Sequence, residues 1–581
     1  MLDNFFRKYD LYIVHLRLRI MPSPYPSLQT ASLPAPILWD LPPSAALHDS
    51  LRPLFNPIQS THPGMLRFSK TNKTGTFLRF DNAWHLESFS SPPPYRSGGF
   101  SGQVAEYKDS TRTGVVKDIS GFCKILHILD AYRVIQGDYP MAQHPGLPSP
   151  GTKSAKLYEK LHDPQNQAYV DSVACYMLSK FREAGHSPHF SLFYGAYLGI
   201  AKKYYYNITE EFSHLRSKAW FWRQCKANHF SLVGFEGDTP LPLDNPLLIP
   251  PETLSESDSE SESESEGNLS EFGDQDGSNV ELTSLHSASI TTESSSPSSR
   301  SSSGSEYSDE IDENITLFAA INEFPTLLMF LETNTATMDS LLYDEDASDQ
   351  PTYELQWTAW IFQVIAALCQ IQSLWAMTHN DLHSNNILWT ETTEEFLYYS
   401  MADGRKWKVP TFGKLFRIID FGRAIYTHND VLCISDDYLS DNEAGSQYNF
   451  GPIYDPNYPR IYPNPSFDLC RLSVSILEGI FGVIPEDKEN GVVLSSEIDR
   501  TQNETVSELY NLLWSWLIDS DGRNVLWNAD GSERYPGFDL YTVIAQKVKG
   551  AVPREQLDKD IFKQFALLTE APEQKFYSLF S

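Results

Sequence analysis

Two short polar motifs carry the residue types that phosphoryl transfer requires. The stretch HNDLHSNN (residues 379–386) holds an Asp and, five positions later, an Asn, and the triplet DFG follows at residues 420–422. Phosphoryl transfer needs a carboxylate that orients the attacking hydroxyl, an amide oxygen for one metal ion and a second carboxylate for the bridging metal ions. Asp381, Asn386 and Asp420 could fill these roles. A polar turn followed by an unrelated DFG turn is the alternative, but the complete, ordered set favours a phosphoryl-transfer site.

The segments around these motifs predict elements that would bring them together. Residues 357–378 are apolar nearly all round and predict a buried helix that leads into the first motif. ILW after Asn386 and RII before Asp420 predict two strands that place the motifs side by side. Upstream, residues 166–185 have helical apolar spacing and end on Gly, and residues 191–200 predict a strand. From Phe467 onward the pattern is mainly helical.

The composition describes a globular chain with one strongly acidic segment. Of its 581 residues, 41% are hydrophobic, and the formal net charge is −31. Residues 252–313 hold 17 acidic side chains and one basic side chain. This Ser-rich segment cannot bury enough apolar surface to offset its ordering entropy, so we expect it to be disordered. The remainder is only mildly acidic, which argues against direct nucleic-acid binding.

Cysteine usage and apolar run lengths indicate a reduced intracellular protein. The six Cys are scattered and form no CxxC pair. Charges interrupt the N-terminal apolar texture before a signal sequence could form, and no uninterrupted apolar run approaches the ~20 residues of a membrane helix. We therefore expect no membrane association, while the sequence leaves the oligomeric state open. Residues 1–20 could be an upstream extension, with Met21 as an alternative start.

The two motifs resemble those of the eukaryotic-type protein kinase family. His383 stands where most such kinases carry Lys, and the resemblance groups it with Asp381 among the catalytic residues. Residues 395–426 insert a long hairpin between the motifs. Both features are similar to the haspin-like kinases and to serine/threonine kinases of giant DNA viruses. The resemblance is specific over residues 356–424 and weak before residue 165.

This resemblance implies a fold and a domain organisation. It implies an α+β, two-lobed fold with a small antiparallel-sheet lobe, a larger mainly helical lobe and ATP in the cleft between them. We expect a poorly ordered Pro/Ser-rich arm over residues 1–76. The small lobe would span residues 77–331, with the acidic insert 252–313 emerging from it, and the helical lobe would span residues 332–581.

The resemblance also implies nucleotide contacts upstream. SGGFSGQV (residues 97–104) is similar to the end of a phosphate-covering loop, with Gly99, Gly102 and Val104 as contact residues. Ser97 replaces the first Gly of the family's pattern. Lys117, at the end of TGVVK, would hold the phosphates of the nucleotide. A surface turn and an exposed strand-end Lys are the alternatives for these two segments.

The usual partner of such a lysine is a Glu on the following helix. Asp171 has the best register for this role, although its side chain is one methylene shorter, and Glu159 remains a rival. Either acid could instead be solvated on a helix surface. Glu332 and Thr333 resemble the hinge between the lobes and would offer backbone groups to an adenine.

One further acid has an architectural role by resemblance. Asp468 matches the buried helix Asp whose carboxylate accepts backbone hydrogen bonds from the loop that carries Asp381. A capping Asp at a helix N-terminus is the alternative.

Two departures from the family pattern bear on regulation and substrate choice. Asn380 replaces the Arg that clamps a phosphorylated activation loop, and no Ala-Pro-Glu follows the DFG triplet, so constitutive activity is expected. The acidic stretch of residues 430–443 fills that space and includes Asp436 and Asp437. We expect it to line the peptide groove and to favour basic substrates.

Together these observations predict a protein serine/threonine kinase that uses ATP and Mg²⁺ and acts on a protein substrate. It would lie in the cytoplasm or nucleus, or in host cytoplasm or virions if the source is viral. A small-molecule kinase of the aminoglycoside or choline type, which shares the H-x-D-L-H-x-x-N pattern, is one alternative. A pseudokinase scaffold, in which the acidic insert is the working part, is another.

Overall fold

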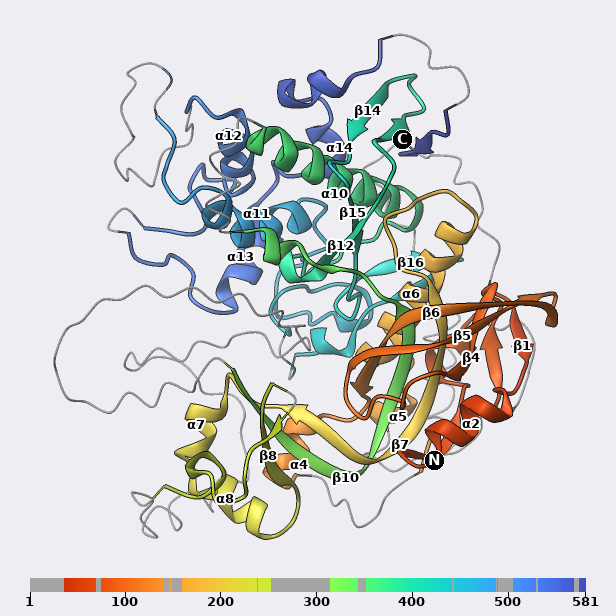
Figure 1. The fold of residues 1–581 in the computed structure, drawn as a ribbon. Coiled ribbons are helices and arrows are strands. Elements are labelled where there is room, and N and C mark those ends of the chain that lie inside the picture. The colour runs from red at the N-terminus through yellow and green to blue at the C-terminus, as the bar shows by residue number, and fades with distance from the viewer. Residues whose placement is uncertain are drawn as a thin grey trace.

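The computed structural model has an α+β architecture in which helices combine with antiparallel sheets (Figure 1). Its sheet-rich part comes from the N-terminal half of the chain and its helix-rich part from the C-terminal half. The structure describes residues 36–68, 75–138, 146–148, 159–237, 239–251, 314–342, 352–440, 442, 444–486, 488, 505–528, 531–568 and 574–580.

A curled antiparallel sheet dominates the N-terminal half. Its strands follow the order β2-β7-β10-β6-β5-β4, and β8 and β9 extend it beside β10. β10 is the central strand and is buried along most of its length, as expected for a strand rich in Leu, Phe and Ile with cover on both faces. The strands are β2 (Phe55–Gln59), β4 (Trp84–Phe89), β5 (Gly98–Lys108), β6 (Thr111–His127), β7 (Phe193–Asn207), β8 (Ser231–Glu236), β9 (Thr239–Pro240) and β10 (Ile315–Glu332).

Residues 36–68 belong to this sheet-rich part and do not form a poorly ordered arm. β1 (Leu38–Asp40) pairs with β3 (Leu78–Phe80), and β2 pairs with β7. Helices α2 (Ala45–Leu51) and α3 (Pro63–Leu66) pack nearby. The expectation for residues 1–76 is therefore corrected over this range, because apolar side chains between the prolines are buried. The remaining residues of the expected arm, except 75 and 76, lie outside the described part. Leu47, Phe55 and Met65 are examples of these buried side chains.

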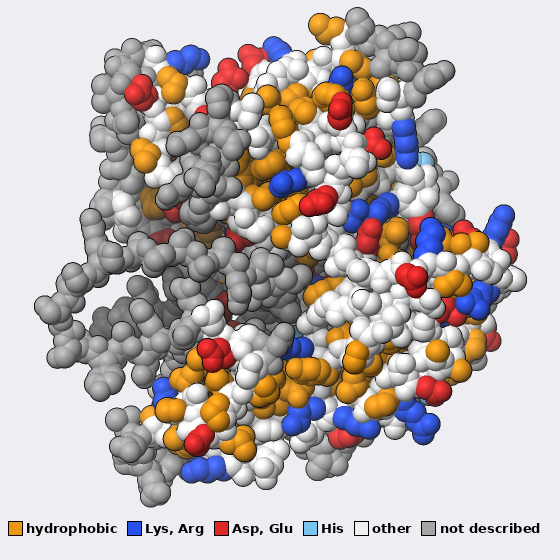
Figure 2. All heavy atoms as spheres, in the orientation of Figure 1, with side chains coloured by type: hydrophobic (Ala, Val, Ile, Leu, Met, Phe, Trp, Pro, Cys, Tyr) orange, Lys and Arg blue, Asp and Glu red, His pale blue; other side chains and the backbone are white. Residues whose placement is uncertain are grey.

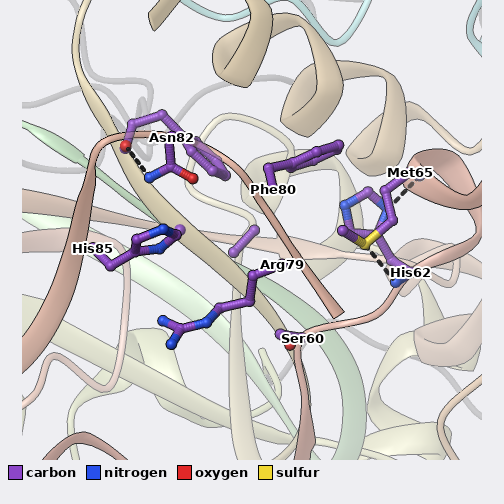
Figure 3. A pocket seen from close by; sticks show the side chains of 10 residues that line it. Ser60, His62, Met65, Arg79, Phe80, Asn82 and His85 are labelled. Carbon is purple, nitrogen blue, oxygen red and sulfur yellow. Dashed lines mark hydrogen bonds between the residues drawn. The ribbon is translucent and has the colours of Figure 1, made fainter. Parts of the chain in front are cut away.

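A buried arginine fastens the N-terminal segment to the sheet. Arg79 donates from Nε to the carbonyl of Leu41 at 2.6 Å and from Nη2 to the carbonyl of Pro42 at 2.7 Å. Figure 3 shows Arg79 beside a small pocket between this segment and β7. The pocket is lined by Ser60, His62, Met65, Arg79, Phe80, Asn82, His85, Phe193, Gly195 and Ala196. None of the candidate catalytic residues lines it.

Helix α6 (Gln167–Glu183) packs against the sheet and the N-terminal segment. Asn166 caps it by accepting a hydrogen bond from the Ala168 N–H, and Gly185 follows its end in the left-handed conformation. Its side chains are buried on nearly every turn. The predicted helix over residues 166–185 is thus confirmed, as is the strand over residues 191–200, which forms the start of β7. Two short helices precede α6, namely α4 (Ala131–Gln136) and α5 (Glu159–His162).

An insertion between β7 and β10 extends the lower end of the sheet in Figure 1. It contains α7 (Phe212–Arg216), α8 (Ala219–Lys226), the strands β8 and β9, and the 3₁₀ helix η3 (Pro246–Leu248). The predicted acidic insert of residues 252–313 lies outside the described residues.

Helix α10 (Tyr353–Trp375) runs through the helix-rich part and leads into the first polar motif. It ends at Ala376, which has a left-handed φ of 48°. By length and composition it could cross a membrane, but 89% of its most apolar window is buried inside the protein. It is therefore a core helix, which confirms the predicted helix of residues 357–378 except that α10 ends at Trp375.

A short sheet that contains β12 (Ile387–Glu391) and β15 (Lys414–Ile418) places the two polar motifs beside each other, and a second short sheet contains the predicted hairpin. β12 pairs antiparallel with β15, as predicted for the ILW and RII segments. The predicted hairpin is also confirmed by the pairing of β13 (Phe396–Ser400) with β14 (Lys406–Pro410). The remaining strands of this part are β11 (Ala336–Thr337), β16 (Tyr426–His428), β17 (Val431–Cys433) and β18 (Tyr577–Ser578).

The C-terminal part is mainly helical, as its sequence pattern predicted. Its helices are α11 (Phe467–Ile480), α12 (Glu508–Trp516), α13 (Asp539–Lys547) and α14 (Pro553–Gln556). Short 3₁₀ helices connect elements of this half of the chain, namely η5 (Met338–Leu341), η6 (Ser384–Asn386), η7 (Asp436–Tyr438), η8 (Gly451–Ile453) and η9 (Asp560–Phe565). On the face shown in Figure 2, basic and acidic side chains of the described residues are intermixed with apolar ones.

Candidate active site

A buried carboxylate accepts hydrogen bonds from the backbone of the loop that carries Asp381. Asp468, in the first turn of α11, accepts hydrogen bonds from the His379 N–H at 3.0 Å and from the Asn380 N–H at 2.9 Å. Its side chain is fully buried, so these backbone donors replace water as its partners. The predicted architectural contact of Asp468 is confirmed.

Asp381 lies at the end of a chain of hydrogen bonds from the C-terminal helices. Tyr541 on α13 donates its hydroxyl to Asp381 Oδ1 at 2.8 Å, and Arg471 Nε donates to the Tyr541 oxygen at 3.0 Å. Burial alone would raise the pKa of Asp381, but Arg423, Arg471 and this hydrogen bond hold it below its usual value. Asp381 is therefore ionised at neutral pH and can accept a proton or orient a hydroxyl.

The side chain of Asn386 is fixed with its oxygen free. Its Nδ2 donates to the Asp381 carbonyl at 2.9 Å and contacts His383 Nε2 at 3.1 Å. Its buried Oδ1 has no hydrogen-bond partner among the described residues. A buried amide oxygen that is left unpaired in this way is suited to a metal ion.

His383 is not a cation in this environment. Burial lowers its pKa to about 4, so the imidazole is neutral at pH 7 and can accept the Asn386 amide hydrogen. The structure therefore gives His383 the role of orienting Asn386. It does not supply the positive charge that a lysine would bring to this position.

The lysine of the site is Lys124, and the choice of Lys117 is corrected. The Nζ of Lys124 lies 2.8 Å from Asp171 Oδ2 and 2.9 Å from Asp420 Oδ1. Burial would lower the pKa of Lys124, but the two carboxylates outweigh it and raise the pKa above its usual value. Lys117 is exposed, and its Nζ lies 3.8 Å from the ring centre of Trp84. Residues seven apart on a strand point to opposite faces, so the two lysines cannot share one site.

Asp171 is the acid that joins this site, and Glu159 is not. Its Oδ1 accepts the Phe421 N–H at 2.9 Å while its Oδ2 binds Lys124. The shorter Asp side chain therefore reaches both groups. Glu159 is exposed at the start of α5.

Asp420 has a constrained backbone. Its φ is 63°, in the left-handed region that non-glycine residues enter at a cost. The preceding Ile419 N–H donates to the Asn386 carbonyl at 3.0 Å, which ties the two motifs directly to each other. The pairing of β12 with β15 therefore brings Asn386 and Asp420 together.

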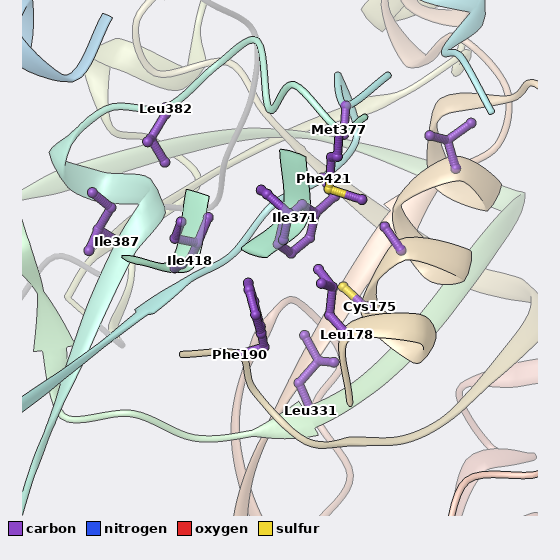
Figure 4. Close-up of a cluster of buried hydrophobic side chains, with 14 of the residues drawn as sticks. Cys175, Leu178, Phe190, Leu331, Ile371, Met377, Leu382, Ile387, Ile418 and Phe421 are labelled. Carbon is purple, nitrogen blue, oxygen red and sulfur yellow. The ribbon is translucent and has the colours of Figure 1, made fainter. Parts of the chain in front are cut away.

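A buried apolar cluster connects this site to helix α6 (Figure 4). Phe421 projects into it from the DFG triplet, and Cys175 and Leu178 project from α6. The cluster gives Asp420 and Asp171 a common, water-excluded support. Its other labelled members are Phe190, Leu331, Ile371, Met377, Leu382, Ile387 and Ile418.

The predicted glycine-rich segment lies within a strand. Gly99 and Gly102 belong to β5, and the turn between β4 and β5 is formed by residues 90–97. A Cβ on Gly102 would lie 2.5 Å from the Ser88 carbonyl oxygen, so glycine permits the close pairing of β4 and β5. Val104 is buried in the core. The register places these residues on β5 after the turn, and the expected phosphate-covering role stays a prediction.

Glu332 ends β10 and ties three elements together. Its carboxylate binds Arg182 of α6 and Arg417 of β15, the latter at 3.1 Å. Its N–H donates to the Leu192 carbonyl at 2.9 Å, so this donor is already used. Thr333 follows directly and is partly buried. Glu332 therefore holds these elements together through its carboxylate, and its N–H is not available to the adenine that the sequence predicts here.

Two of the aspartates in the acidic stretch after Asp420 are buried. Asp436 and Asp437 are buried, at 4% and 9% exposure, and only Asp430 of the three described acids is exposed. The expected recognition of basic peptides by Asp436 and Asp437 is therefore corrected, because both carboxylates face the interior. Asp441 and Glu443 lie outside the described residues.

Among the described residues, a small set of oxygen donors could hold a magnesium ion. Within the described ranges, no three His, Cys, Asp or Glu side chains come close enough to form a metal cluster. The unpaired Asn386 Oδ1 and the Asp420 carboxylate are the oxygens that could serve as ligands. Mg²⁺ commonly binds through one or two protein oxygens and takes its other ligands from water and phosphates, so this pair is a fit.

Sequence reasoning found Asp381, Asn386, Asp420, Asp468 and Asp171, and it missed Lys124, Tyr541 and Arg471. The basic residue at 124 lies in the segment GFCKIL, whose apolar neighbours signal a buried strand. No local signal identifies Tyr541 or Arg471. No protein-family model matches this chain, and no curated protein matches it at a significant level.

Proposed function

We propose that this chain is a protein kinase that transfers the γ-phosphoryl group of Mg-ATP to Ser or Thr hydroxyls of proteins. In this proposal the sheet-rich and helix-rich parts are the two lobes of a protein-kinase-like fold, with ATP between them. The observation that carries it is the ion pairing of Lys124 with both Asp171 and Asp420. A partly buried lysine paired with a helix acid, next to a DFG Asp that can hold the metal ion, is the arrangement that protein kinases use for phosphoryl transfer.

Each group then has a distinct task. Lys124 would bind the phosphate oxygens of ATP while Asp171 holds its ammonium group in place. Asn386 and Asp420 would bind Mg²⁺, which neutralises charge on the phosphates. Asp381 would accept the hydrogen of the substrate hydroxyl and aim its oxygen at the γ-phosphorus, and the proton would leave through this carboxylate.

Tyr541 has a supporting task in this scheme. It occupies one oxygen of Asp381, which leaves Oδ2 for the substrate hydroxyl. A carboxylate fixed by one hydrogen bond loses less conformational freedom when it engages substrate. Tyr541 is thus a positioning residue for Asp381.

The limited exposure of Asp381 favours a second candidate function, a nucleotide-binding scaffold without transfer activity. Only 5% of the residue is accessible, and one of its carboxylate oxygens already accepts the Tyr541 hydroxyl. The four retained groups argue for activity, because a scaffold has no chemical need for Lys124, Asp381, Asn386 and Asp420 together.

A transfer assay separates these functions. The purified full chain is incubated with γ-labelled ATP and Mg²⁺ and offered casein, histones, choline or an aminoglycoside. We expect label on Ser or Thr of a protein, and loss of roughly 10²-fold or more in the Asp381→Asn variant. Label on choline or the aminoglycoside alone would contradict the substrate class, and ATP binding without any transfer would support the scaffold.

A further inference from the structure

The chain segment that follows Asp420 is fastened to the start of helix α6 by Asp436. Its Oδ1 accepts the Gln167 N–H at 3.0 Å, and its own N–H donates to the Gln165 carbonyl at 2.8 Å. Its Oδ2 lies 3.4 Å from Lys160 Nζ. The carboxylate therefore has partners on both oxygens, which belong to α5 and to the start of α6.

This location favours a negative charge. Gln167 is the first residue of the 17-residue helix α6, where backbone N–H groups have no partner within the helix. The helix dipole adds a partial positive charge at the same end. Burial would lower the pKa of Lys160, but Asp436 and then Asp437 raise it above its usual value, so the ion pair is maintained at neutral pH.

Further contacts run between the same two segments. Tyr426 donates its hydroxyl to the Val170 carbonyl at 2.8 Å. The Gln167 side chain packs on Gly422, where an added Cβ would lie 3.1 Å from the Gln167 Cγ. Asp171 itself accepts the Phe421 N–H at 2.9 Å. Asp171 is four residues after Gln167 and therefore lies one helical turn above the fastened end.

We propose that Asp436 is a positioning residue which docks the segment after Asp420 onto α6 and so keeps Asp171 within reach of Lys124. The Lys124–Asp171 pair is then formed without any phosphorylation of this segment. Neutral hydrogen bonds to Asn380 support the same docked state, since Asn380 Nδ2 donates to the Arg423 carbonyl at 3.0 Å and Tyr448 donates to Asn380 Oδ1 at 2.6 Å. The catalytic consequence of this inference rests on the proposed function, whereas the docking itself does not.

The test compares Asp436→Asn and Asp436→Ala with Asp430→Asn in the full chain. Asp430 lies in the same segment and loses the same charge, but it is exposed, and its φ of 63° is one that Asn tolerates. Two measurements are made on each variant. They are amide hydrogen exchange of residues 167–175 and kcat/KM for Mg-ATP at a fixed protein substrate concentration.

We expect exchange to rise and kcat/KM for Mg-ATP to fall in a graded order. The effect should be about tenfold or more for Asp436→Ala and smaller for Asp436→Asn, which keeps an acceptor for Gln167. Asp436→Glu should recover part of the loss, and Lys160→Met, which removes only the ion pair, should resemble Asp436→Asn. Asp430→Asn should match the wild type in both measurements.

The outcomes separate this inference from the proposed function. Equal exchange in Asp436→Ala and Asp430→Asn would overturn the docking role. Unchanged kcat/KM for Mg-ATP beside raised exchange would overturn the link to Lys124. A wild type that transfers no phosphoryl group, with the exchange contrast intact, would contradict the proposed function and leave the docking role supported. If Asp436→Ala fails to fold, the comparison of Asp436→Asn and Lys160→Met with Asp430→Asn decides the matter in the same way.

Discussion

At the scale of single residues, the site depends on how each charged group is held. Asp381 is kept ionised by nearby arginines and by the hydroxyl of Tyr541, despite its burial. His383 is kept neutral by burial, and its Nε2 can accept a hydrogen bond from the side-chain amide of Asn386. Both groups have the protonation state that their contacts require at pH 7.

Removal of the Tyr541 hydroxyl should change the pH profile of transfer. This hydrogen bond lowers the pKa of Asp381, so in Tyr541→Phe that pKa rises and the carboxylate is protonated earlier as the pH falls. We expect the acidic limb of kcat against pH to move to higher pH and kcat at pH 7.5 to fall several-fold. The profile is measured between pH 3 and 8 with saturating Mg-ATP, so that it includes the range in which Asp381 takes up a proton. An unshifted limb, or a kcat above that of the wild type, would show that Tyr541 blocks Asp381 and does not position it.

Loss of the Asp420 carboxylate should uncouple magnesium from nucleotide binding. In Asp420→Ala, the ion pair with Lys124 and one proposed metal ligand are both removed. We expect ATP affinity measured by titration to become independent of magnesium concentration. If magnesium still tightened ATP binding in this variant to the wild-type extent, the metal assignment would be wrong.

At the scale of elements, close strand pairing and helix docking set the positions of these residues. β4 and β5 approach closely at Gly102. β6 pairs with β5 and places Lys124 in contact with Asp171 of α6. Helix α6 is held by the N-terminal segment on one side and by the residues after Asp420 on the other. The geometry of the lysine site therefore depends on elements from four separate parts of the chain.

A matched pair of glycine substitutions tests the β4–β5 approach. A Cβ at Gly102 would lie 2.5 Å from a backbone oxygen, whereas a Cβ at Gly99 would lie 3.9 Å from its nearest neighbour. We expect Gly102→Ala to lower the free energy of unfolding by about 1–3 kcal/mol. Gly99→Ala should stay within about 0.5 kcal/mol of the wild type. Equal urea midpoints for the two variants would contradict the described register.

The sequence alone predicted those parts of the site whose residues lie close together along the chain. Asp381 and Asn386 share one loop, and the apolar helix before it and the strands after it were visible as patterns. The sequence indicated Lys117 and did not identify Lys124, because strand register is fixed by distant pairing partners and not by neighbouring residues. Tyr541 lies 160 residues after Asp381, and only tertiary packing brings the two together. The burial of Asp436 could not be predicted for the same reason. A run of acids predicts a solvated surface, and only tertiary packing places this carboxylate in the interior.

At the scale of the whole molecule, stability should depend on pH through buried histidines. Burial lowers the pKa of His62 to about 3 and that of His189 to about 4, below the value of about 6.5 in an unfolded chain. Below pH 6.5 these two histidines bind protons in the unfolded chain but remain neutral in the folded chain. The free energy of unfolding therefore falls as the pH decreases toward 4. Each histidine contributes about 1 kcal/mol per pH unit in this window.

Thermal unfolding between pH 5 and 8 measures this dependence. We expect Tm to be nearly constant from pH 7 to 8 and to fall steadily below pH 6.5. His189 contacts the Phe416 carbonyl and the Tyr399 hydroxyl, and His189→Gln offers a donor and an acceptor without titrating. The slope below pH 6.5 should therefore be smaller in His189→Gln, and an unchanged slope would remove His189 from the explanation.

The placement of the phosphate-binding lysine is the central claim, and one comparison tests it most directly. Phosphoryl transfer is measured at saturating Mg-ATP for Lys124→Met and Lys117→Met in the full chain. Both substitutions remove one positive charge from β6, but only Lys124 contacts Asp171 and Asp420. The account predicts a loss of roughly 10²-fold or more in Lys124→Met and a wild-type rate in Lys117→Met. Wild-type transfer by Lys124→Met, or a comparable loss in both variants, would contradict it.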